Sequence, residues 1–361
     1  MTILFLSIEF NYCCGVSRHI HLLSRGLKRD GHTVILGAPG GTMVDDFLTE
    51  GMKFVPLPIF SPSINLFSIL KYFYQINKMI MKYKVDIIHF HHRFPELLAI
   101  PISYIKKIPT ITTCHNILLG KKNISYKSKK IIAVSDAVKC HLKEYFGVGN
   151  EKIVMIRNAP REFKKIDKAK VIQYKKDLAI FESNLVIGGF GRLHIEKGFD
   201  ILIDTLKIAA SNGNQIDCVI AGDGPERINL EKIAVENKLK VRFLGELQNL
   251  SLYYELCDII VIPSRKESSS LIALEAATFK KAIIVSNVGG LKEIVVDHIN
   301  GLTFESEQSL QLYEAINEYL LNEELRKHCA QSLHKLLKES YSVDKMVEKT
   351  ESVYNEVLKF N

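Results

Sequence analysis

The sequence predicts an α/β protein made of two doubly wound units, each with a parallel sheet. Short apolar segments alternate with helical stretches of ten or more residues, and this pattern occurs twice along the chain. Such alternation is typical of parallel strands joined by right-handed helical crossovers. A chain of 361 residues is long enough for two domains of ordinary size. We therefore expect one unit in residues 1–160 and another in residues 161–342.

The first unit is expected to begin with a strand at Ile3–Phe10. A loop containing Gly15 follows, and then a helix from about Ser17 to Lys28. The later strands of this unit are predicted from apolar runs that turn signals separate. They are TVILGA after Gly31, VDIIHFH (Val85–His91), TITTCH (Thr110–His115) and KIIAVS (Lys130–Ser135).

The second unit repeats this order, beginning with the strand Leu185–Gly191 and the amphipathic helix FDILIDTLKIAA. Further strands are predicted at IDCVIAG, VRFLG, DIIVIPS and KAIIVS. The polar, lysine-rich segment from Arg157 to about Asn184 is the predicted linker. The tail from about Val343 to Asn361 has a helical pattern, but its spacing alone does not assign it to either unit.

Composition and charge exclude several classes of protein. The chain is 47% hydrophobic and 24% charged, as in a soluble globular protein. It has no apolar run of the roughly 18–20 residues that span a bilayer, and its beginning lacks the pattern of a signal peptide. Its seven cysteines form no CxxC pair, so we expect a reduced, cytoplasmic protein.

The net positive charge of the chain lies in the first unit. Residues 1–160 hold 21 Lys and Arg against 10 Asp and Glu, with a cluster at Lys121, Lys122, Lys127, Lys129 and Lys130. Such a surface attracts nucleic acid, anionic lipid head groups or phosphorylated substrates, unless it is simply a solvated face. No helix-turn-helix, zinc-finger or RNP pattern is present, so we do not expect nucleic acid as a partner.

A turn that could bind a diphosphate follows the strand Leu185–Gly191. It carries Arg192 and Lys197, and Gly198 comes directly before the next helix. A turn that ends a strand and opens a helix directs backbone N–H groups and the positive end of the helix dipole towards an anion. The two cations add a forked donor and a point charge. The alternative is an ordinary charged surface turn.

Two carboxylates lie around the start of another helix. Glu275 is the only ionisable residue in LIALEAATF. Glu267 precedes the predicted start of the helix, in a serine-rich loop where Ser268, Ser269 and Ser270 are candidate N-caps. A lone carboxylate in a buried helix is costly unless donors satisfy it. The pair suggests a site for a ligand with several hydroxyl groups. The alternative for Glu275 is a salt-bridged glutamate of the core.

Other residues at the ends of predicted strands are also candidates for a function. Asp223, in the turn Gly222–Pro225, is expected to be structural, and Gly289 and Gly290 either admit a phosphate or turn the chain. The strand that ends in His89, His91 and His92 has no third ligand at a suitable spacing, so we expect no metal there. His115 ends another strand. Cys13 and Cys14 are expected to pack as small apolar residues.

Motifs across nearly the whole chain resemble those of the retaining GT-B glycosyltransferases of family four, the glycosyl transferases group 1. In the second half they are FGRLHIEKGFDILIDTL, VIAGDGPER, VRFLGEL, IIVIPSRKESSSLIALEAAT and NVGGLKEIV, and in the first half DIIHFHH, TTCHN, IAVSDAVK and VMIRNAP. The resemblance implies an acceptor-side domain in residues 1–160, with a helix of about 343–361 crossing back onto it. It also implies a nucleotide-sugar-binding domain in residues 161–342 that faces the first across a cleft.

The resemblance also implies roles for individual residues. Arg192 and Lys197 would bind the donor diphosphate, and Glu275 the ribose hydroxyls. Glu267 would bind the transferred sugar, and His115 would line the pocket near the sugar and phosphate. The expected catalytic residues are thus Arg192, Lys197, Glu267 and His115. The remaining donor contacts are expected from Gly15, Gly191, Ser268, Ser269, Ser270 and Leu271.

The activity implied is the transfer of a hexose-type sugar from a nucleotide diphosphate, with UDP favoured, to a glycan or lipid-linked glycan. The resemblance implies that no cofactor and no metal are needed, and the absence of an Asp-x-Asp pair agrees with this. The setting implied is bacterial surface polysaccharide synthesis in the cytoplasm, at the inner membrane face if the amphipathic stretch Asn65–Lys84 docks there. The alternatives are a nucleotide-sugar epimerase of the same fold and a non-catalytic nucleotide-sugar binder.

Two departures from the family pattern bear on specificity. The first loop reads NYCCGVS and is poorer in glycine than usual in the family, so the acceptor side is expected to be unusual. Where a Gly-Phe-Gly commonly follows the first glutamate, this chain has Ser268, Ser269 and Ser270 before Leu271. This change alters the wall around the sugar, and the sequence therefore does not identify which sugar is transferred.

Overall fold

The computed structural model describes residues 1–12, 14–58, 66–163 and 166–359. Contacts divide the chain into two compact units. The first unit contains residues 1–159 and 342–361, and the second contains residues 160–341. These bounds differ by one residue from those expected from the sequence.

The first unit contains a parallel sheet of seven strands in the order β3-β2-β1-β4-β5-β6-β7. The strands are β1 (Thr2–Leu6), β2 (Thr33–Ala38), β3 (Lys53–Pro56), β4 (Ile87–Phe90), β5 (Thr110–Cys114), β6 (Lys130–Ala133) and β7 (Ile153–Met155). The central strand β1 pairs in register on both sides, with Leu4 opposite Ile35 and Ile88. The strand order reverses direction next to β1, as in nucleotide-binding folds.

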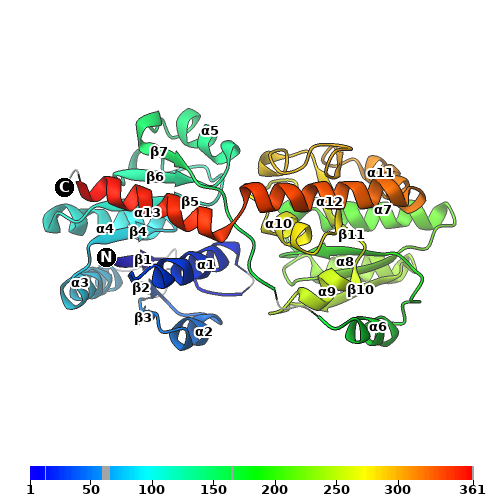
Figure 1. Ribbon diagram of the computed structural model, residues 1–361, viewed down its shortest axis with the longest axis horizontal. Helices are drawn as coiled ribbons and strands as arrows, with labels where there is room; N and C mark the ends of the chain where they lie inside the picture. Colours follow the sequence, from blue (N-terminus) through cyan, green and yellow to red (C-terminus); the bar gives the residue numbers. More distant parts are fainter. Residues whose placement is uncertain (13, 59–65, 164–165, 360–361) are drawn as a thin grey trace. The chain divides into compact units, whose positions relative to one another are not determined.

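Helices cover both faces of this sheet (Figure 1). They are α1 (Gly15–Arg29), α2 (Val44–Thr49), α3 (Leu66–Tyr83), α4 (Arg93–Lys106), α5 (Asp136–Glu144) and α13 (Val343–Lys359). Because both faces are covered, strands such as β1 are apolar at successive positions, and Ile3, Leu4 and Phe5 are fully buried. One core lies on the α1 and α13 side, and another lies on the α3 and α4 side.

The tail of the chain forms α13, which packs beside α1 (Figure 1). Its apolar residues Met346, Val347, Val353, Tyr354 and Val357 are all buried in the first unit. A Cβ atom added to Gly26 of α1 would lie 2.2 Å from Cγ2 of Val347. The two helices therefore approach closely only because position 26 has no side chain. The structure thus assigns the tail, which its spacing alone left open, to the first unit.

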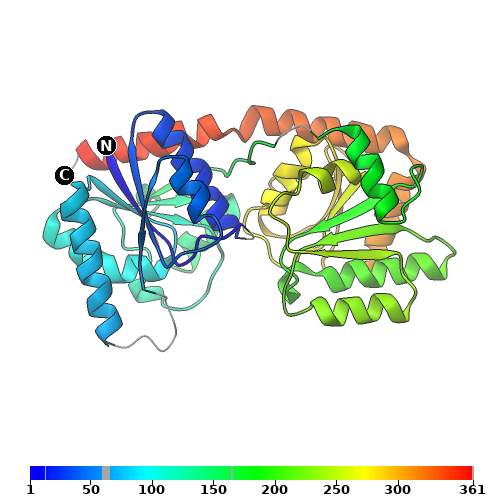
Figure 2. The same ribbon diagram turned by 90° about the horizontal axis from the view of Figure 1, so that it is seen from below.

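The second unit contains a parallel sheet of six strands in the order β10-β9-β8-β11-β12-β13. The strands are β8 (Val186–Phe190), β9 (Asp217–Ala221), β10 (Val241–Gly245), β11 (Ile259–Ile262), β12 (Ala282–Ser286) and β13 (Leu302–Phe304). Its helices are α6 (Lys168–Asp177), α7 (Phe199–Ser211), α8 (Arg227–Glu236), α9 (Ser251–Leu256), α10 (Leu271–Thr278), α11 (Ser309–Leu321) and α12 (Glu323–Ser340). Figure 2 shows helices on both faces of this sheet.

The prediction of a linker from Arg157 to about Asn184 is wrong for most of that segment. It contains α6, which packs on α9 through the hydroxyls of Tyr174 and Tyr253, 2.9 Å apart. Lys175 of α6 donates to the backbone of Glu182 and Asn184. The lysine-rich composition reflects the exposed face of a helix that belongs to the second unit, and not an extended connection.

Three strands were missed in the sequence, namely β3, β7 and β13. Each has three or four residues and lies at an edge of its sheet. Edge strands are buried less completely, so they lack the long apolar runs by which the central strands were found. Among the described residues, no helix has both the length and the apolar character needed to cross a membrane.

Candidate functional site

The loops that follow β8, β9, β11 and β12 lie at one edge of the second sheet, because parallel strands end on the same side. Their backbones hold one another in place. The amide of Gly290 donates a hydrogen bond to the carbonyl of Glu267 at 2.8 Å. The amide of Arg265 donates one to the carbonyl of Glu196, also at 2.8 Å. The sequence-predicted residues Gly191, Arg192, Lys197, Glu267, Ser268, Ser269, Ser270 and Leu271 all lie in or beside these loops.

Two glycines are required for this close packing of loops. Gly198 has φ +65°, and a Cβ atom there would lie 2.0 Å from the carbonyl oxygen of Pro263. Gly289 has φ +45°, and a Cβ atom there would lie 2.0 Å from the carbonyl oxygen of Glu267. Such positions exclude any residue with a side chain. Of the two expectations for Gly289, the structure therefore shows the structural one: it lets two loops touch.

Lys197 and Glu267 meet at this edge. Lys197 ends the short helix η3 (Ile195–Lys197) after β8, and its Nζ lies 2.8 Å from Oε2 of Glu267 in the loop after β11. Ser264 Oγ is 3.4 Å from the same oxygen. The side chain of Lys197 is 35% exposed and that of Glu267 is 12% exposed. The pair is therefore open to solvent on the lysine side and could receive an anionic ligand there.

Arg192 lies in the same loop as Lys197 and is exposed. In the described part of the chain its guanidinium makes no ion pair with a carboxylate. A cation that is not already neutralised is suited to bind a phosphate oxygen. The loop therefore holds one paired and one unpaired cation.

The helix α10 begins at Leu271, after the serine-rich loop. Ser270 is its N-cap, and its Oγ accepts a hydrogen bond from the amide of Ala273 at 3.3 Å. This confirms the expectation from the sequence that a serine of this loop caps the helix, and the serine is Ser270. The first turn of α10 contains no acidic residue, so the positive end of its dipole is not offset by a carboxylate within that turn.

Glu275 lies inside α10 and is 1% exposed. Its Oε1 is 3.2 Å from Nε of Arg161, and its Oε2 accepts a hydrogen bond from the hydroxyl of Tyr254 at 2.9 Å. The guanidinium of Arg161 also lies over the ring of Phe163, 4.6 Å from its centroid. Glu275 is thus buried and salt-bridged within the second unit.

Arg265 was missed in the sequence, although it organises the site. Its guanidinium donates two hydrogen bonds to Asp200, at 2.7 and 2.6 Å, one to the carbonyl of Ile195 at 2.7 Å, and others to Glu307. Burial raises the pKa of Asp200, but the bonds from Arg265 outweigh it and leave that pKa below its usual value. Arg265 thereby joins the loop after β11 to the loop after β8 and to α7.

Asp223 is structural, as expected. Its Oδ1 accepts from the amide of Gly224 at 2.7 Å, and its Oδ2 pairs with Arg227 at 2.8 Å. These bonds close the turn after β9 and tie it to the start of α8. They leave the side chain occupied within its own loop.

Gly15 and His115 lie in the first unit. Gly15 is the first residue of α1 and follows the N-cap Cys14. Burial, with a contribution from Glu9, raises the pKa of the Cys14 thiol, so Cys14 is not a reactive thiolate and the packing interpretation holds for it. Cys13 lies outside the described residues. His115 directly follows β5, and its Nε2 is 3.2 Å from Nδ1 of His91.

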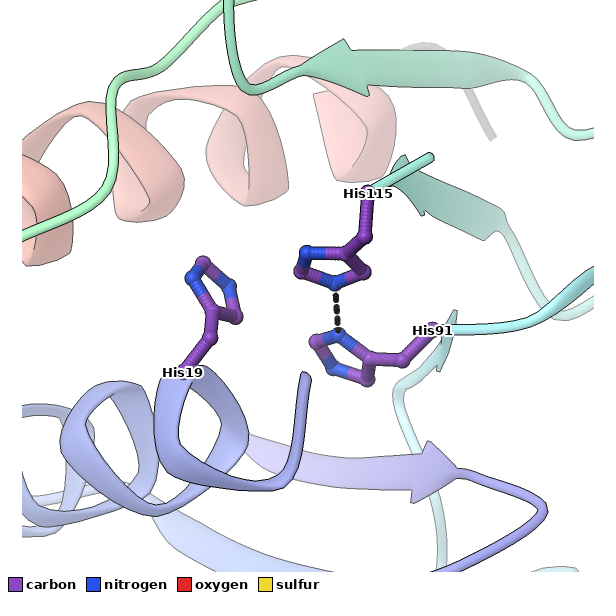
Figure 3. A group of neighbouring side chains, drawn as sticks. All are labelled: His19, His91 and His115. Atoms are coloured by element: carbon purple, nitrogen blue, oxygen red, sulfur yellow. Dashed lines mark hydrogen bonds between the residues drawn. The ribbon is translucent and has the colours of Figure 1, made fainter. Parts of the chain in front are cut away.

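His115 belongs to a group of histidines that the sequence did not reveal. His19 of α1, His91 after β4 and His115 after β5 each place one ring nitrogen within 4.8 Å of the others (Figure 3). The expectation of no metal rested on the absence of a third ligand near His91 in the sequence. In space, two further histidines arrive from distant segments.

Comparison with known proteins identifies the family. Residues 171–336 match the model of the glycosyl transferases group 1, and residues 14–159 match that of Glycosyltransferase Family 4. An uncharacterized glycosyltransferase of Methanocaldococcus jannaschii, MJ1178, is 30% identical over 99% of both chains. The chain belongs to the group 1 glycosyltransferases. Another relative is the O-antigen biosynthesis glycosyltransferase WclY of Escherichia coli, which is 25% identical over 76% of this chain and 80% of its own.

Solved structures show that this glycosyltransferase has the expected GT-B fold. A glycosyltransferase from Rickettsia africae is 25% identical and superimposes with a TM-score of 0.86 over 100% of this chain and 99% of its own. HepE of Anabaena, solved with UDP-glucose, is 19% identical and gives a TM-score of 0.86 over 99% and 100%. The prediction of a group 1 glycosyltransferase with two parallel sheets is confirmed.

Proposed function

We propose that this glycosyltransferase transfers a hexose-type sugar from a UDP-sugar to a glycan or lipid-linked glycan, with UDP as the leaving group, and retains the configuration of the anomeric carbon. The observation that carries the proposal is the contact between Lys197 and Glu267 at the carboxyl edge of the second sheet, beside Arg192 and the N-terminus of α10. Cations, a carboxylate and a helix N-terminus thus lie in neighbouring loops at this edge of the sheet. A sugar diphosphate presents the complementary groups.

Several relatives support the choice of donor and acceptor. Solved structures of HepE contain UDP, UDP with glucose, and UDP-glucose. WclY is named for O-antigen biosynthesis, which supports a role in bacterial surface polysaccharide synthesis. One chain of the human phosphatidylinositol N-acetylglucosaminyltransferase is 25% identical over 96% of this chain and 73% of its own, which supports a lipid-linked acceptor.

In the proposed reaction, the site acts mainly by electrostatic stabilisation of the leaving group. Negative charge grows on the departing diphosphate, and fixed donors that face it lower the barrier. Arg192 and Lys197 supply two cations, and the N-terminus of α10 supplies dipole charge. We propose that this field replaces a metal ion at the diphosphate. The acceptor then attacks on the face that the diphosphate leaves, and a phosphate oxygen takes the acceptor's proton.

Glu267 has a positioning role in this scheme. Its carboxylate accepts hydrogen bonds from hydroxyls of the transferred sugar, beside the backbone of Ser268, Ser269 and Ser270, while Lys197 turns towards the diphosphate. Glu275 is the proposed acceptor for the ribose hydroxyls. A ribose bound there shares the carboxylate with Arg161 and Tyr254, which already engage both of its oxygens.

Substitution of Lys197 tests the proposal. We expect Lys197→Ala to lower kcat by about a hundredfold, because removing one donor to a developing oxyanion costs about 3 kcal/mol. The matched control is Lys232→Ala, since Lys232 is an exposed lysine of α8 in the same unit. Wild-type turnover in Lys197→Ala refutes the assignment.

Two further measurements test other parts of the proposal. The anomeric configuration of the product, read by NMR, tests retention. Unchanged turnover in EDTA tests the absence of a metal at the diphosphate.

Two alternatives predict different products from the same incubation. A nucleotide-sugar epimerase of this fold converts the donor without an acceptor, and it needs further acid–base groups near the sugar. A non-catalytic binder consumes no donor at all. Analysis of the sugar nucleotide and the acceptor, with and without acceptor present, therefore distinguishes all three. We expect donor consumption and product only when the acceptor is included.

We also propose that the first unit meets the inner face of an anionic membrane, where a lipid-linked acceptor resides. The helix α3 packs on the sheet with one face, burying Tyr72, Ile76 and Met79. Its other face exposes apolar side chains between lysines. Phe67 is 74% exposed, Leu70 57%, Tyr74 66% and Met81 62%, and Lys71, Lys78 and Lys82 lie among them.

The neighbouring helix α4 extends this surface. Tyr104 and Ile105 are 74% and 79% exposed, and Lys106 Nζ lies 3.7 Å from the sulfur of Met81. Apolar side chains that enter a head-group region, with lysines alongside, are the two features that favour interfacial binding to anionic lipid. Packing on the sheet and membrane docking are therefore compatible, because they use opposite faces of α3.

Vesicle flotation tests the membrane proposal. We expect the full chain to float with vesicles that contain phosphatidylglycerol at low salt, and to remain in solution with neutral vesicles. The double variant Leu70→Glu/Tyr74→Glu should lose flotation. Leu321→Glu, at an exposed leucine of α11 in the second unit, is the matched charge control and should float. No wild-type flotation at low salt removes the membrane claim and leaves the transferase assignment untouched.

A further inference from the structure

Three histidines of the first unit come together from three separate elements. His19 lies in α1, His91 directly follows β4, and His115 directly follows β5. The strands β4 and β5 are parallel neighbours, so they end at the same edge of the sheet. Figure 3 shows the ring of His19 facing the pair formed by His91 and His115. One nitrogen from each ring lies within 4.8 Å of the others.

Burial acts on the pKa of all three rings in the same direction. Burial lowers the pKa of His19 to about 4. Burial, and then the neighbouring histidines, lower the pKa values of His91 and His115 well below the usual value.

Hydrogen bonds leave two nitrogens of the group without a partner. His19 Nδ1 lies 2.9 Å from Oδ1 of Asn158 and donates to it, which leaves Nε2 of His19 with its lone pair. Within the described residues, Nε2 of His19 and Nε2 of His91 are both buried and make no hydrogen bond. A buried polar atom without a partner is destabilising. Nε2 of His19 is the nitrogen of this ring that is available to a bound ligand.

We propose that His19, His91 and His115 form a binding site for one zinc-like transition-metal ion. Imidazole is a preferred ligand of such ions. In a tetrahedral site with bonds of about 2.0–2.1 Å, two ligand nitrogens lie about 3.3 Å apart. Nδ1 of His91 and Nε2 of His115 share a hydrogen bond of 3.2 Å and so already lie near this spacing. The ion takes the place of the shared proton, which moves to the other nitrogen of the same ring. Closing the site requires the ring of His19 to approach further, since the group spans up to 4.8 Å.

The surroundings of the group support a metal more than a simple packing role. The bond from His19 Nδ1 to Asn158 is the outer contact that ligating histidines usually make, and it orients the ring towards the site. No carboxylate from the described residues joins the three histidines, so a bound divalent ion keeps its charge. A fourth position is then open to hydroxide or to an anionic group of a ligand. All three ligands belong to the first unit, whereas the proposed diphosphate site is built from residues of the second.

Metal titration of the full chain tests this proposal. Protein stripped with a chelator is titrated with Zn²⁺ by calorimetry and with Co²⁺ by visible spectroscopy, since tetrahedral Co²⁺ has strong visible bands. We expect one equivalent to bind. His91→Ala should abolish this binding, and Asn158→Ala should weaken it about 10–100-fold, because loss of an outer partner has that effect. Asn158→Asp should restore it.

The control is His328→Ala, at an exposed histidine of α12 in the second unit, which should bind one equivalent as the wild type does. Circular dichroism checks that each variant is folded. The wild-type titration involves no variant, so a wild-type chain that takes up no metal overturns the proposal by itself. One equivalent that still binds to folded His91→Ala overturns it as well. Neither result affects the assignment of the sugar transferase.

Discussion

Individual residues of the donor region divide into two kinds that the sequence did not separate. The side chain of Glu267 is partly exposed to solvent and pairs with Lys197, whereas that of Glu275 is buried and pairs with Arg161. Their spacing in the chain was the motif that suggested a site. Both residues carry the same charge, but their surroundings predict different effects when they are substituted.

For Glu275 we predict a loss of stability. Glu275→Gln keeps an acceptor for the hydroxyl of Tyr254 but leaves the charge of Arg161 without its partner. Breaking a buried ion pair from one side costs about 3 kcal/mol. Urea unfolding followed by circular dichroism should show this loss. Glu231→Gln, in a surface pair with Arg227, is the matched control and should change stability by less than about 1 kcal/mol.

The opposite result for Glu275→Gln is equally informative. Unchanged stability together with a fall in UDP affinity contradicts a core role and favours the ribose contact that the resemblance implies. The two measurements are independent, because unfolding is followed without nucleotide and affinity is measured in folded protein.

At the scale of elements, the packing of α1 on α13 decides how the end of the chain is held. Gly26 permits the approach, since a Cβ atom there would lie 2.2 Å from Val347. Val347 itself is 1% exposed. From the sequence, Gly26 is only a weak residue in a helical pattern, and nothing near it identifies a partner so distant along the chain.

For this contact we predict that Gly26→Ala destabilises the first unit. Alanine favours the helix by about 1 kcal/mol over glycine, but crowding in a close-packed core costs about 1–3 kcal/mol. The double variant Gly26→Ala/Val347→Ala should recover part of the loss, because the second change removes the clashing methyl groups. Arg25→Ala, on an exposed part of α1, is the control. A stabilising effect of Gly26→Ala alone contradicts the prediction. Chemical unfolding provides the measurement.

Loops are the elements in which prediction from sequence was least complete. The turn residues after β8 and β11 were identified, yet Arg265, which joins those loops through Asp200, was not. Arginine in a polar loop is common, and the groups that accept its hydrogen bonds come from segments that are distant in sequence. Only their positions in the fold distinguish Arg265 from Lys266 beside it, which is exposed.

At the scale of the whole molecule, the charge and the chemistry are divided between the two units. The net positive charge, the exposed apolar face of α3 and the three histidines belong to the first unit. The loops with Arg192, Lys197 and Glu267 belong to the second. Each unit has its own sheet and its own cores. We therefore expect a nucleotide to protect the second unit, and lipid or a metal ion to protect the first.

We predict that UDP stabilises the second unit more than GDP or ADP does. A nucleotide at about 100 times its dissociation constant adds about 2.7 kcal/mol to the stability of the state that binds it. Hydrogen exchange should show the strongest protection in residues 191–198 and 264–271. Lys197→Ala should reduce this protection. Protection confined to the first unit contradicts the placement of the donor site, and equal effects of all three nucleotides contradict the preference for UDP.

The sequence alone determined the fold class, most central strands and helices, the family and the positions of the turn residues. These follow from local periodicity, from turn residues and from motifs of short spacing, which a chain carries whatever its tertiary contacts. Only the tertiary structure decided that α6 belongs to the second unit, that α13 packs on α1, that Glu275 is paired in the core, and that three histidines meet. Each of these depends on which distant segments become neighbours, because burial, charge pairing and ligand geometry arise from contacts in space.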